Sequence, residues 1–331
     1  MPTDPPDPDR RTRLRLLGAG AALALGGKGW AQARFPTRPI TLIVPFGAGG
    51  IADITARTVG EAMARSLGQP VVVDNRPSAG SIVASQAVAT ARPDGHTLLL
   101  MSNGHAVSVG LFRKLPYDTQ KDFTPISLLG SFDLGLFVAA GARWHTLKEL
   151  LAHARAQPGR LSVGTIAAGS TQHLAAKLFE TVAGVDLLVV PYKGSPAVLA
   201  ALRGGEIDLA VEFVGPMLAQ VRAGVVQALA VSSGQRHPAL PEVPTVQQAG
   251  VAGYDVASWN ALAAPAGTPA DVIERLNQAV REALVAAPVR DKLAALGMRV
   301  GASTPAVQEQ LLASEIRRWG EVIRAAKIEP E

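Results

Sequence analysis

The chain has 331 residues, of which 48% are hydrophobic and 18% charged, a globular composition that is long enough for two domains. It contains no cysteine, which excludes disulfides, thiolate metal sites and a cysteine nucleophile. The five basic and three acidic residues of segment 1–33 leave the rest of the chain with a net charge of only +3. This small charge is spread along the sequence, so we expect no nucleic-acid partner.

The first 33 residues have the three parts of a signal peptide. Four arginines between positions 10 and 15 precede a short apolar run, 16–27, and a small-x-small sequence follows at 31–33. The apolar run is too short to span a bilayer comfortably, which disfavours a membrane anchor. We therefore expect cleavage after Ala33 and a periplasmic location. The Arg10-Arg11 pair leaves the choice between general and twin-arginine export open.

Strand-like and helical segments alternate after position 33, which predicts an α/β fold with parallel or mixed sheets flanked by helices. Apolar residues recur at helical spacing from Ala56 to Leu67 and from Leu312 to Ile323. Thr-Pro pairs at 268 and 304 mark the starts of two late helices. The expected strands are Ile40–Val44, Val71–Asp74, Thr97–Met101, Leu161–Gly164, Leu187–Val190, Ile207–Val211 and Val226–Ser232.

Two long apolar stretches, Ile126–Gly141 and Val256–Pro265, do not fit this alternation. We interpret both as strands that cross between two lobes. One lobe would then be discontinuous and comprise 34–133 plus 257–331, and the other would comprise 134–256.

A glycine-rich turn, Pro45-Phe46-Gly47-Ala48-Gly49-Gly50, separates the first strand from the first helix. Glycine allows positive φ and lets a ligand approach the backbone closely. The following helix N-terminus offers unpaired N–H groups and the positive end of the helix dipole. The turn therefore predicts an anion site that needs no cationic side chain.

The same turn has an alternative interpretation. Gly47-x-Gly49-x-x-Ala52 fits the permissive dinucleotide-binding fingerprint, and Asp74 lies where a ribose-binding acid belongs. However, Pro45-Phe46 separates the strand from the first glycine, and nicotinamide cofactors are not replenished outside the cytoplasm. We expect no cofactor, and an exported NAD(P)-dependent oxidoreductase is the alternative from another functional class.

Two further loops of small and hydroxyl residues follow strands, at 75–81 and at 164–173. In the second of these, Ser170 or Thr171 is placed to cap a helix. Open α/β sheets bind ligands outside the carboxyl ends of their strands. Three such loops, divided between two lobes, therefore predict a ligand-binding cleft.

A series of short motifs runs through almost the whole chain after position 34. They are Phe35-Pro36-x-Arg38-Pro39-Ile40, Pro45-Phe46 with Gly49-Gly50-x-x-Asp53, Asn75-Arg76-Pro77-x-Ala79-Gly80, Asp94-Gly95, Leu115-Pro116-Tyr117-Asp118, Asp122-Phe123-x-Pro125-Ile126, Gly169-Ser170 with His173, Val190-Pro191-Tyr192-Lys193-Gly194, Leu229-Ala230-Val231 with Arg236, Val243-Pro244-Thr245, Trp259 and Pro265-Ala266-Gly267-Thr268-Pro269. In this order they resemble the solute receptors of tripartite tricarboxylate transporters, the Bug-type periplasmic binding proteins.

The resemblance implies a two-lobed Venus-flytrap receptor with the type II binding-protein fold. Such a receptor is not an enzyme: it captures a small carboxylate for a membrane permease, and we expect a monomer. A ligand sensor that feeds a signalling kinase remains an alternative, and the identity of the carboxylate is left open.

The resemblance also carries ligand-binding residues over to this sequence. They are Phe46, Ala48, Gly49, Gly50 and Asp53 in the first loop, Ala79 and Gly80 in the second, and Gly169, Ser170, Thr171 and His173 in the third. Asp53 would pin the glycine loop, because a bare carboxylate would repel an anionic ligand. The chain departs from the family pattern at 165–168 and at Ala261, which puts the shape of the pocket in doubt.

The remaining ionisable residues give weaker indications. No two of the six histidines have the i, i+4 spacing of a helical metal site, so we expect no metal. His173 fits a helix face and a pocket equally well, and Lys193 fits a solvated strand end. Glu212 would favour an ammonium-bearing ligand if it lined the pocket, but a surface position is the preferred interpretation. Ser170 lacks the sequence frame of a hydrolase nucleophile.

Overall fold

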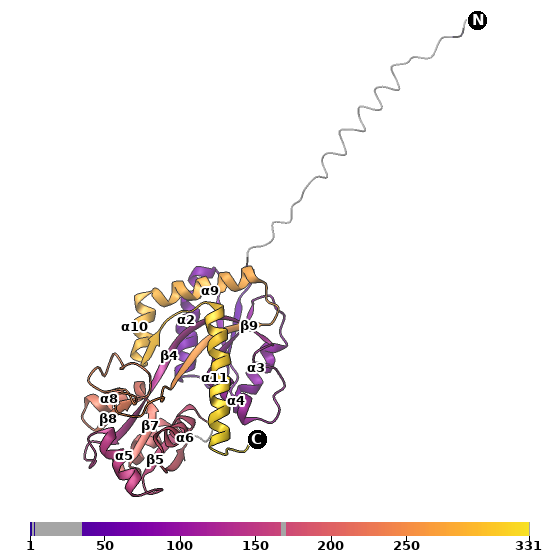
Figure 1. The fold of residues 1–331 in the computed structure, drawn as a ribbon. Coiled ribbons are helices and arrows are strands. Elements are labelled where there is room, and N and C mark those ends of the chain that lie inside the picture. The colour runs from indigo at the N-terminus through magenta and orange to yellow at the C-terminus, as the bar shows by residue number, and fades with distance from the viewer. Residues whose placement is uncertain (2, 4–34, 167–169, 331) are drawn as a thin grey trace.

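The computed structural model describes residues 1, 3, 35–166 and 170–330. The predicted signal peptide and its cleavage site lie outside the described residues, apart from positions 1 and 3. Within the described part of the chain, no helix combines the length and apolarity that a membrane crossing requires. The described residues form two lobes, one above the other in Figure 1.

One mixed sheet runs through both lobes. Its strand order is β2-β1-β3-β9-β4-β7-β5-β6, and β8 and β10 pair with β4 outside this path. The strands are β1 (Ile40–Val44), β2 (Val71–Asn75), β3 (Thr97–Ser102), β4 (Phe123–Ala139), β5 (Ser162–Ile166), β6 (Leu188–Tyr192), β7 (Leu209–Phe213), β8 (Val226–Val231), β9 (Ala257–Pro265) and β10 (Met298–Val300). All seven strands expected from the alternation are confirmed, with ends within two residues of the prediction. The short strand β10 was not expected.

Strand β4 is the element that both lobes share. It pairs with β9 from Phe123 to Asp133, and from Leu134 onward with β7 and β8 instead. The expectation of two crossing strands is therefore right for β4 and wrong for β9, which pairs only with β3 and β4 in the first lobe. The lobe boundaries at 133/134 and 256/257 stay a prediction, which the change of partners in β4 supports.

Ser232 ties together the two backbone segments that connect the lobes. Its N–H donates to the Leu134 carbonyl at 2.9 Å, and the Leu134 N–H donates to its hydroxyl oxygen at 3.0 Å. The hydroxyl lies 2.6 Å from the Val256 carbonyl oxygen, and the Val256 N–H donates to the Ser232 carbonyl at 3.0 Å. Since Ser232 is fully buried, these bonds hold the two connecting segments side by side without competition from water.

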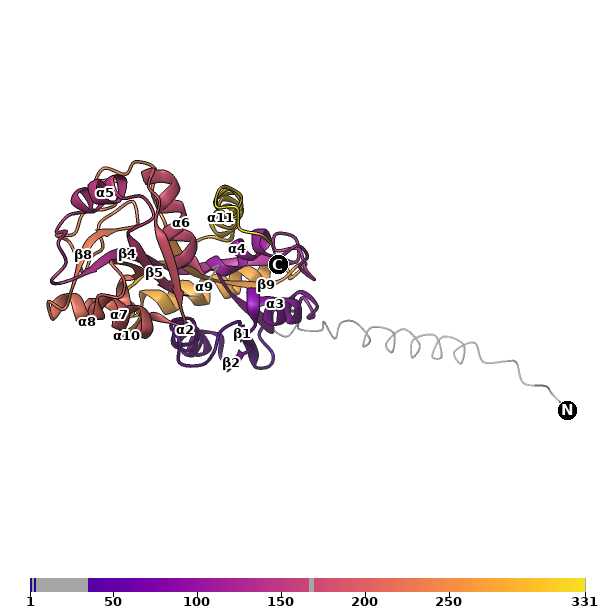
Figure 2. The same ribbon diagram turned by 90° about the horizontal axis from the view of Figure 1, so that it is seen from below.

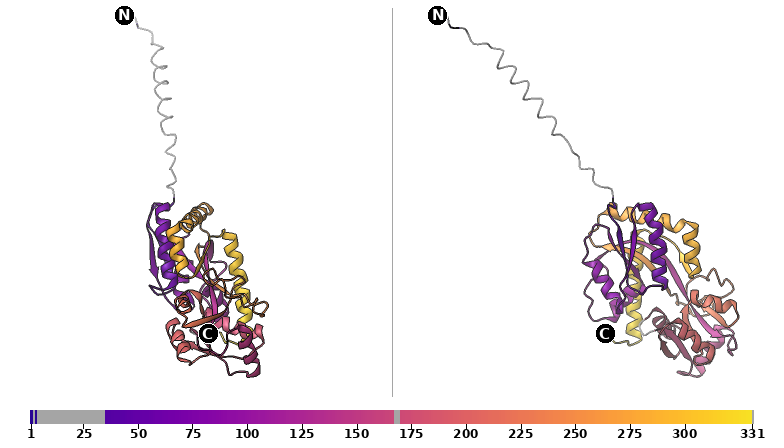
Figure 3. Two further views of the ribbon diagram at one scale, coloured as in Figure 1. Left: turned by 90° about the vertical axis from the view of Figure 1, so that its left-hand side faces the viewer. Right: turned by 180° about the vertical axis from the view of Figure 1, so that it is seen from behind.

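Helices cover both faces of the sheet (Figure 2). The first lobe carries α2 (Ile51–Leu67), α9 (Ala270–Val285) and α10 (Ala287–Ala295) on one face, and α3 (Ile82–Ala89), α4 (Asn103–Leu111) and α11 (Pro305–Ala325) on the other. The second lobe carries α5 (Leu147–Ala156) and α6 (Thr171–Ala183) on one face, and α7 (Ser195–Gly204) and α8 (Val214–Arg222) on the other. The early helix α2 packs against the late helix α9, so the two ends of the chain build one lobe (Figure 3).

A buried ion pair lies beside the point where β4 passes between the lobes. Arg299 of β10 contacts the Asp133 carboxylate at 2.7 Å, and Asp133 is 1% exposed. The same guanidinium donates to the carbonyl oxygens of Gln235, at 3.0 Å, and Arg236, at 2.8 Å. Arg299 therefore connects the first lobe to a loop of the second, and without it the Asp133 carboxylate would be buried and unpaired.

We expect Arg299→Met to destabilise the fold by about 3 kcal/mol, because a buried carboxylate that loses its partner keeps its desolvation penalty. Arg38→Met is the matched control. The Arg38–Asp94 pair has a similar distance, 3.0 Å, but both side chains are more than a third exposed, so its loss should cost less than about 1 kcal/mol. Urea unfolding of both variants measures the difference, and equal losses would contradict a structural role for the Arg299 pair.

Candidate ligand-binding cleft

A cavity of about 380 Å³ lies where residues of both lobes meet. Its lining comes from the loop after β1, the starts of five helices, and strands β4, β5 and β9. The lining residues are Phe46, Gly50, Ile51, Ala52, Ser102, Gly104, Val107, Phe132, Ile166, Ser170, Thr171, Gln172, Ser195, Phe213, Pro216, Ser258 and Asn260. This volume suits a small organic molecule.

The N-termini of five helices lie at the cavity. Helices α2 and α4 come from the first lobe, and α6, α7 and α8 from the second. Side chains cap α4 and α6, where Ser102 accepts from the Gly104 N–H and Ser170 from the His173 N–H. The caps of α2, α7 and α8 are Gly50, Gly194 and Phe213, and none of these makes a side-chain capping bond. Five positive dipole ends therefore meet at one cavity, three of them uncapped by a side chain.

The cavity combines this positive potential with an uncharged wall. Among the described residues that line it, none has an ionisable side chain. Phe132 and Phe213 come from different lobes and meet edge to face, with ring centroids 6.2 Å apart. The arrangement favours a small anion with an apolar or weakly polar body, because helix ends attract the charge and the aromatic rings contact the rest.

Asp53 holds the glycine-rich turn in place through hydrogen bonds. Its carboxylate accepts from the Gly49 N–H at 2.9 Å and from Asn75 Nδ2 at 2.9 Å, and it pairs with Arg57 at 3.0 Å. The same Asn75 amide donates to the Phe46 carbonyl at 3.0 Å. Gly49 has φ +82°, which L side chains rarely adopt. The network fixes the turn in the conformation that presents Phe46 and Gly50 to the cavity.

The ionisation of Asp53 depends on the same contacts. Burial raises the pKa of the Asp53 carboxyl, but the hydrogen bonds from Arg57, Gly49 and Asn75 together outweigh burial and hold this pKa below its ordinary value. The carboxylate is thus charged at neutral pH, and its acceptor capacity is used on the loop and on Arg57.

The cavity includes some of the ligand-binding residues expected from the sequence and not others. Phe46, Gly50, Ser170 and Thr171 line it. Ala48, Gly49, Asp53, Ala79, Gly80 and His173 are not among its lining residues, and Gly169 lies outside the described residues. Ligand contact by any of them stays a prediction.

The second loop, which contributes no residue to the cavity lining, packs against α4. Gly80 has φ +58°, and a Cβ at this position would collide with the Phe112 ring. The Ser108 hydroxyl donates to the Gly80 carbonyl at 3.1 Å. The need for glycine at position 80 therefore comes from close packing of this loop on α4.

Glu212 lies in the interior, although a surface position was the preferred interpretation of the sequence. It is fully buried, because β7 lies between β4 and β5 and helices cover both faces of the sheet there. Its Oε1 atom accepts from Gln172 Nε2 at 2.8 Å and from the Phe213 N–H at 2.7 Å. Burial raises the pKa of the Glu212 carboxyl despite these bonds and a hydrogen bond with Ser195. The preferred surface interpretation of Glu212 was wrong.

His173 and Lys193 both lie outside the cavity lining. His173 is half-buried in the first turn of α6, and burial, together with the charge of Lys177, lowers its pKa. Lys193 is exposed just before α7, as a solvated strand end predicts. Neither side chain therefore forms part of the cavity wall.

Thirteen of the 17 lining residues were not among the ligand-binding residues expected from the sequence. The missed polar residues are Ser102, Gln172, Ser195, Ser258 and Asn260. Ser258 and Asn260 alternate with Trp259 inside an apolar stretch, and this period of two indicates that the two polar side chains share one strand face. Ser195 precedes a proline, a common helix start. Both signals were present, but neither says which sheet edge the residues reach.

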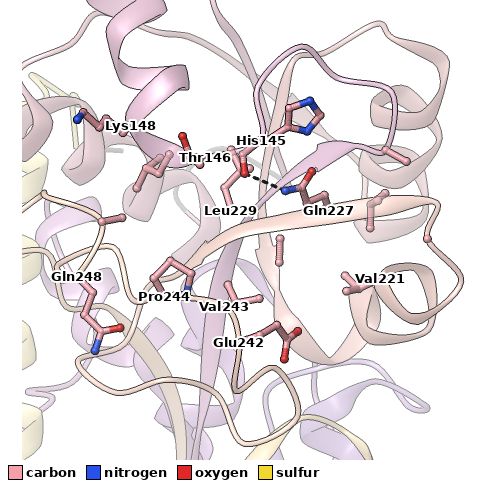
Figure 4. Close-up of a pocket in the computed structure, with 16 residues that line it drawn as sticks. His145, Thr146, Lys148, Val221, Gln227, Leu229, Glu242, Val243, Pro244 and Gln248 are labelled. Atoms are coloured by element: carbon pink, nitrogen blue, oxygen red, sulfur yellow. Dashed lines mark hydrogen bonds between the residues drawn. The ribbon is translucent and has the colours of Figure 1, made fainter.

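A second, larger hollow of about 720 Å³ lies on the second lobe, lined by the start of α5, by β8 and by loop 242–249. Figure 4 shows its polar side chains: Gln227 donates to the His145 carbonyl at 2.9 Å, and His145, Lys148 and Glu242 point in different directions. All three ionisable side chains are exposed. This hollow is lined by the start of one helix, α5, which Thr146 caps, whereas the starts of five helices line the first cavity; the first cavity is therefore the better candidate for an anion site.

Two observations bear on the alternative dinucleotide interpretation and on metal binding. Asp74, to which the alternative interpretation gave the ribose, pairs with Arg76 at 2.8 Å and is not part of the cavity lining. Within the described ranges, no group of three or more histidine and acidic side chains is arranged to hold a metal ion.

Comparison with known proteins agrees with the geometry. Residues 55–328 match the model of the tripartite tricarboxylate transporter family receptor. A protein encoded between tcbD and tcbE in Pseudomonas sp. strain P51 is 40% identical over 96% of both chains. Two structures from Rhodopseudomonas palustris have the same fold. MatC with bound malate is 36% identical, with a TM-score of 0.74 over 87% of this chain and 100% of MatC. Rpa4515 with adipate is 34% identical, with a TM-score of 0.77 over 90% of this chain and 100% of Rpa4515. The chain therefore belongs to the tripartite tricarboxylate transporter receptor family, whose members are periplasmic solute-binding proteins with a two-lobed α/β fold.

Proposed function

We propose that this protein is a receptor that captures a small carboxylate between its two lobes and presents it to the membrane permease of a tripartite tricarboxylate-type uptake system. The observation that carries the proposal is the uncharged cavity at which five helix N-termini meet. A carboxylate bound there would accept hydrogen bonds from backbone N–H groups without a cationic side chain. The malate and adipate found in two related structures are carboxylates of suitable size.

The fold also supplies a way to close on the ligand. Each lobe contributes different helix N-termini to the cavity. An anion would therefore be surrounded by all five N-termini only when the lobes are closed on it. The segments that connect the lobes meet at Ser232, which gives closure a natural hinge. Release to the permease would follow from opening at this hinge.

A thermal-shift screen of the purified protein tests the function. The panel contains mono-, di- and tricarboxylates, aromatic acids, neutral sugars, NAD and NADP. A carboxylate at about one hundred times its dissociation constant should add about 2.7 kcal/mol of stability, whereas the sugars should add none. Stabilisation by NAD or NADP without any response to acids would overturn the receptor function and favour the exported oxidoreductase. Uptake assays with and without the permease genes separate transport from a sensory role.

We expect Asp53→Asn to weaken carboxylate binding about tenfold, because an amide cannot accept from Gly49, Asn75 and Arg57 together. Asp74→Asn is the matched control, since Asp74 is partly exposed and lies outside the cavity lining. Isothermal titration with the best acid from the screen compares the two variants. The reverse result, loss of binding in Asp74→Asn alone, would contradict the assigned role of the glycine loop.

The pH dependence of stability offers an independent check of Asp53. Its pKa in the folded state is below the unfolded value of about 3.9, so its contribution is fully present above that value and is lost as the pH falls through the folded pKa. Unfolding curves of the wild type and of Asp53→Asn should therefore converge below about pH 4 and differ most above it. A difference that stays constant from pH 3 to pH 7 would show that the charge of Asp53 is unimportant.

A further inference from the structure

Asn103, the first residue of α4, forms a hydrogen bond between the two lobes. It is fully buried, and its Nδ2 donates to the Thr171 hydroxyl oxygen at 3.0 Å. Helix α4 packs on β3 and β9 of the first lobe, whereas α6, which begins at Thr171, packs on β5 and β7 of the second. The bond therefore joins elements that separate when the lobes move apart.

The orientation of the Asn103 amide follows from its other partner. Trp319 of α11 donates its Nε1–H to Asn103 Oδ1 at 2.7 Å. An indole nitrogen can only donate, so the amide oxygen faces Trp319 and the amide nitrogen faces Thr171. Helix α11 lies beside both α4 and α6 (Figure 2). Trp319 and Asn103 both belong to the first lobe, so their bond does not depend on the position of the second lobe.

Thr171 extends these contacts to the cavity. It is one of the lining residues, in the first turn of α6. Its hydroxyl oxygen accepts from Asn103, and no described residue accepts its hydroxyl hydrogen, which leaves that hydrogen for a molecule in the cavity. The Trp319 N–H, the Asn103 amide and the Thr171 hydroxyl thus form a series of donors that leads toward the cavity. Hydrogen bonds in such a series polarise one another, which favours an anion at its end.

The location of this bond distinguishes it from the contacts at the crossing point of the lobes. Ser232 and Arg299 act beside the segments that connect the lobes, where the chain itself limits separation. Asn103 and Thr171 are 68 positions apart in the sequence. Ser102 and Gly104, the neighbours of Asn103, line the cavity. Opening of the cleft would therefore break this bond and deprive the Asn103 amide of its acceptor.

We propose that the Asn103–Thr171 hydrogen bond is a latch that holds the two lobes closed on a bound carboxylate. Asn103 is a positioning residue in this proposal, because it acts through Thr171. The inference rests on the proposed carboxylate-binding function and adds to it the residue that controls release. Because the bond forms only on closure, it slows dissociation of the bound acid and leaves the association rate unchanged.

Asn103→Leu in the full-length protein tests the latch. Leucine keeps the branch at Cγ and removes the amide, and Trp319 retains Glu315 Oε2 as an acceptor at 2.8 Å. The probes are malate, adipate and the other acids of the thermal-shift panel. We expect the dissociation rate constant of the bound acid, measured by stopped-flow fluorescence, to rise about fivefold, and the association rate constant to change by less than about twofold. If Asn103→Leu does not fold, as judged by circular dichroism, Asn103→Ala removes the same amide with less volume.

Asn277→Leu is the matched control. Asn277 is also a buried amide of the first lobe, but its Nδ2 donates to the carbonyl oxygens of Ile126, at 2.7 Å, and Ser303, at 2.8 Å, which belong to the same lobe. This variant should be less stable in urea and should release the acid at the rate of the wild type. An equal acceleration of release in both variants would indicate a general loss of stability and would overturn the latch.

A double-mutant cycle separates the latch from a purely structural role of Asn103. Thr171→Val removes the acceptor of the bond and keeps the branched shape of the side chain. In the Thr171→Val background, Asn103→Leu should accelerate release no further, because the bond is already absent. The same acceleration in both backgrounds would show that Asn103 does not act through Thr171, and the latch would be overturned.

The outcomes also separate the inference from the function on which it rests. An unchanged dissociation rate in Asn103→Leu, or slower association alone, would overturn the latch and leave carboxylate binding intact. Failure of the wild type to bind any acid of the panel would overturn the proposed function together with this inference.

Discussion

The passage of β4 through both lobes is the constraint on which the rest of the molecule depends. Because this one strand pairs with β9 up to Asp133 and with β7 and β8 from Leu134 onward, it fixes where the sheets of the two lobes begin. The strands on either side can then direct their carboxyl ends, and the helices that follow them, toward the space between the lobes. Ser232 and Arg299 reinforce this crossing point with buried hydrogen bonds and an ion pair.

In the proposed function, the backbone supplies the positive potential at the cleft. Helices α2, α4, α6, α7 and α8 all begin at the cavity, and each contributes N–H groups that lack partners within the helix. Two acidic side chains outside the cavity lining position groups that line it. Asp53 holds the turn before α2, and Glu212 holds Gln172 at the start of α6. Both acids are buried, yet the environment affects them in opposite ways. Asp53 has a guanidinium beside it and its pKa is lowered, whereas Glu212 has only neutral donors and burial raises its pKa.

Local sequence was sufficient wherever one continuous segment determines the structure. The run from Ile40 to Asp53 contains a strand, a glycine turn and a helix start in order, and so its place at the cleft followed from the sequence. The same was not true of Asn260, because β9 reaches the cavity by pairing with β3, about 160 residues earlier in the chain. Glu212 was misjudged for a related reason: the sequence shows a strand that ends in an acid, but not that this strand lies in the middle of the sheet. Periodicity predicts a strand, whereas its neighbours depend on long-range pairing.

The proposed role of helix dipoles at the cleft also bears on how such a receptor can diversify. A dipole belongs to the helix as a whole, so replacing a side chain in the wall leaves it almost unchanged. Under the proposed function, wall residues such as Phe132, Phe213 and Asn260 could be exchanged during evolution while the helix ends still attract an acid group. A lineage built on this scaffold would then acquire new nutrients through changes in the walls alone.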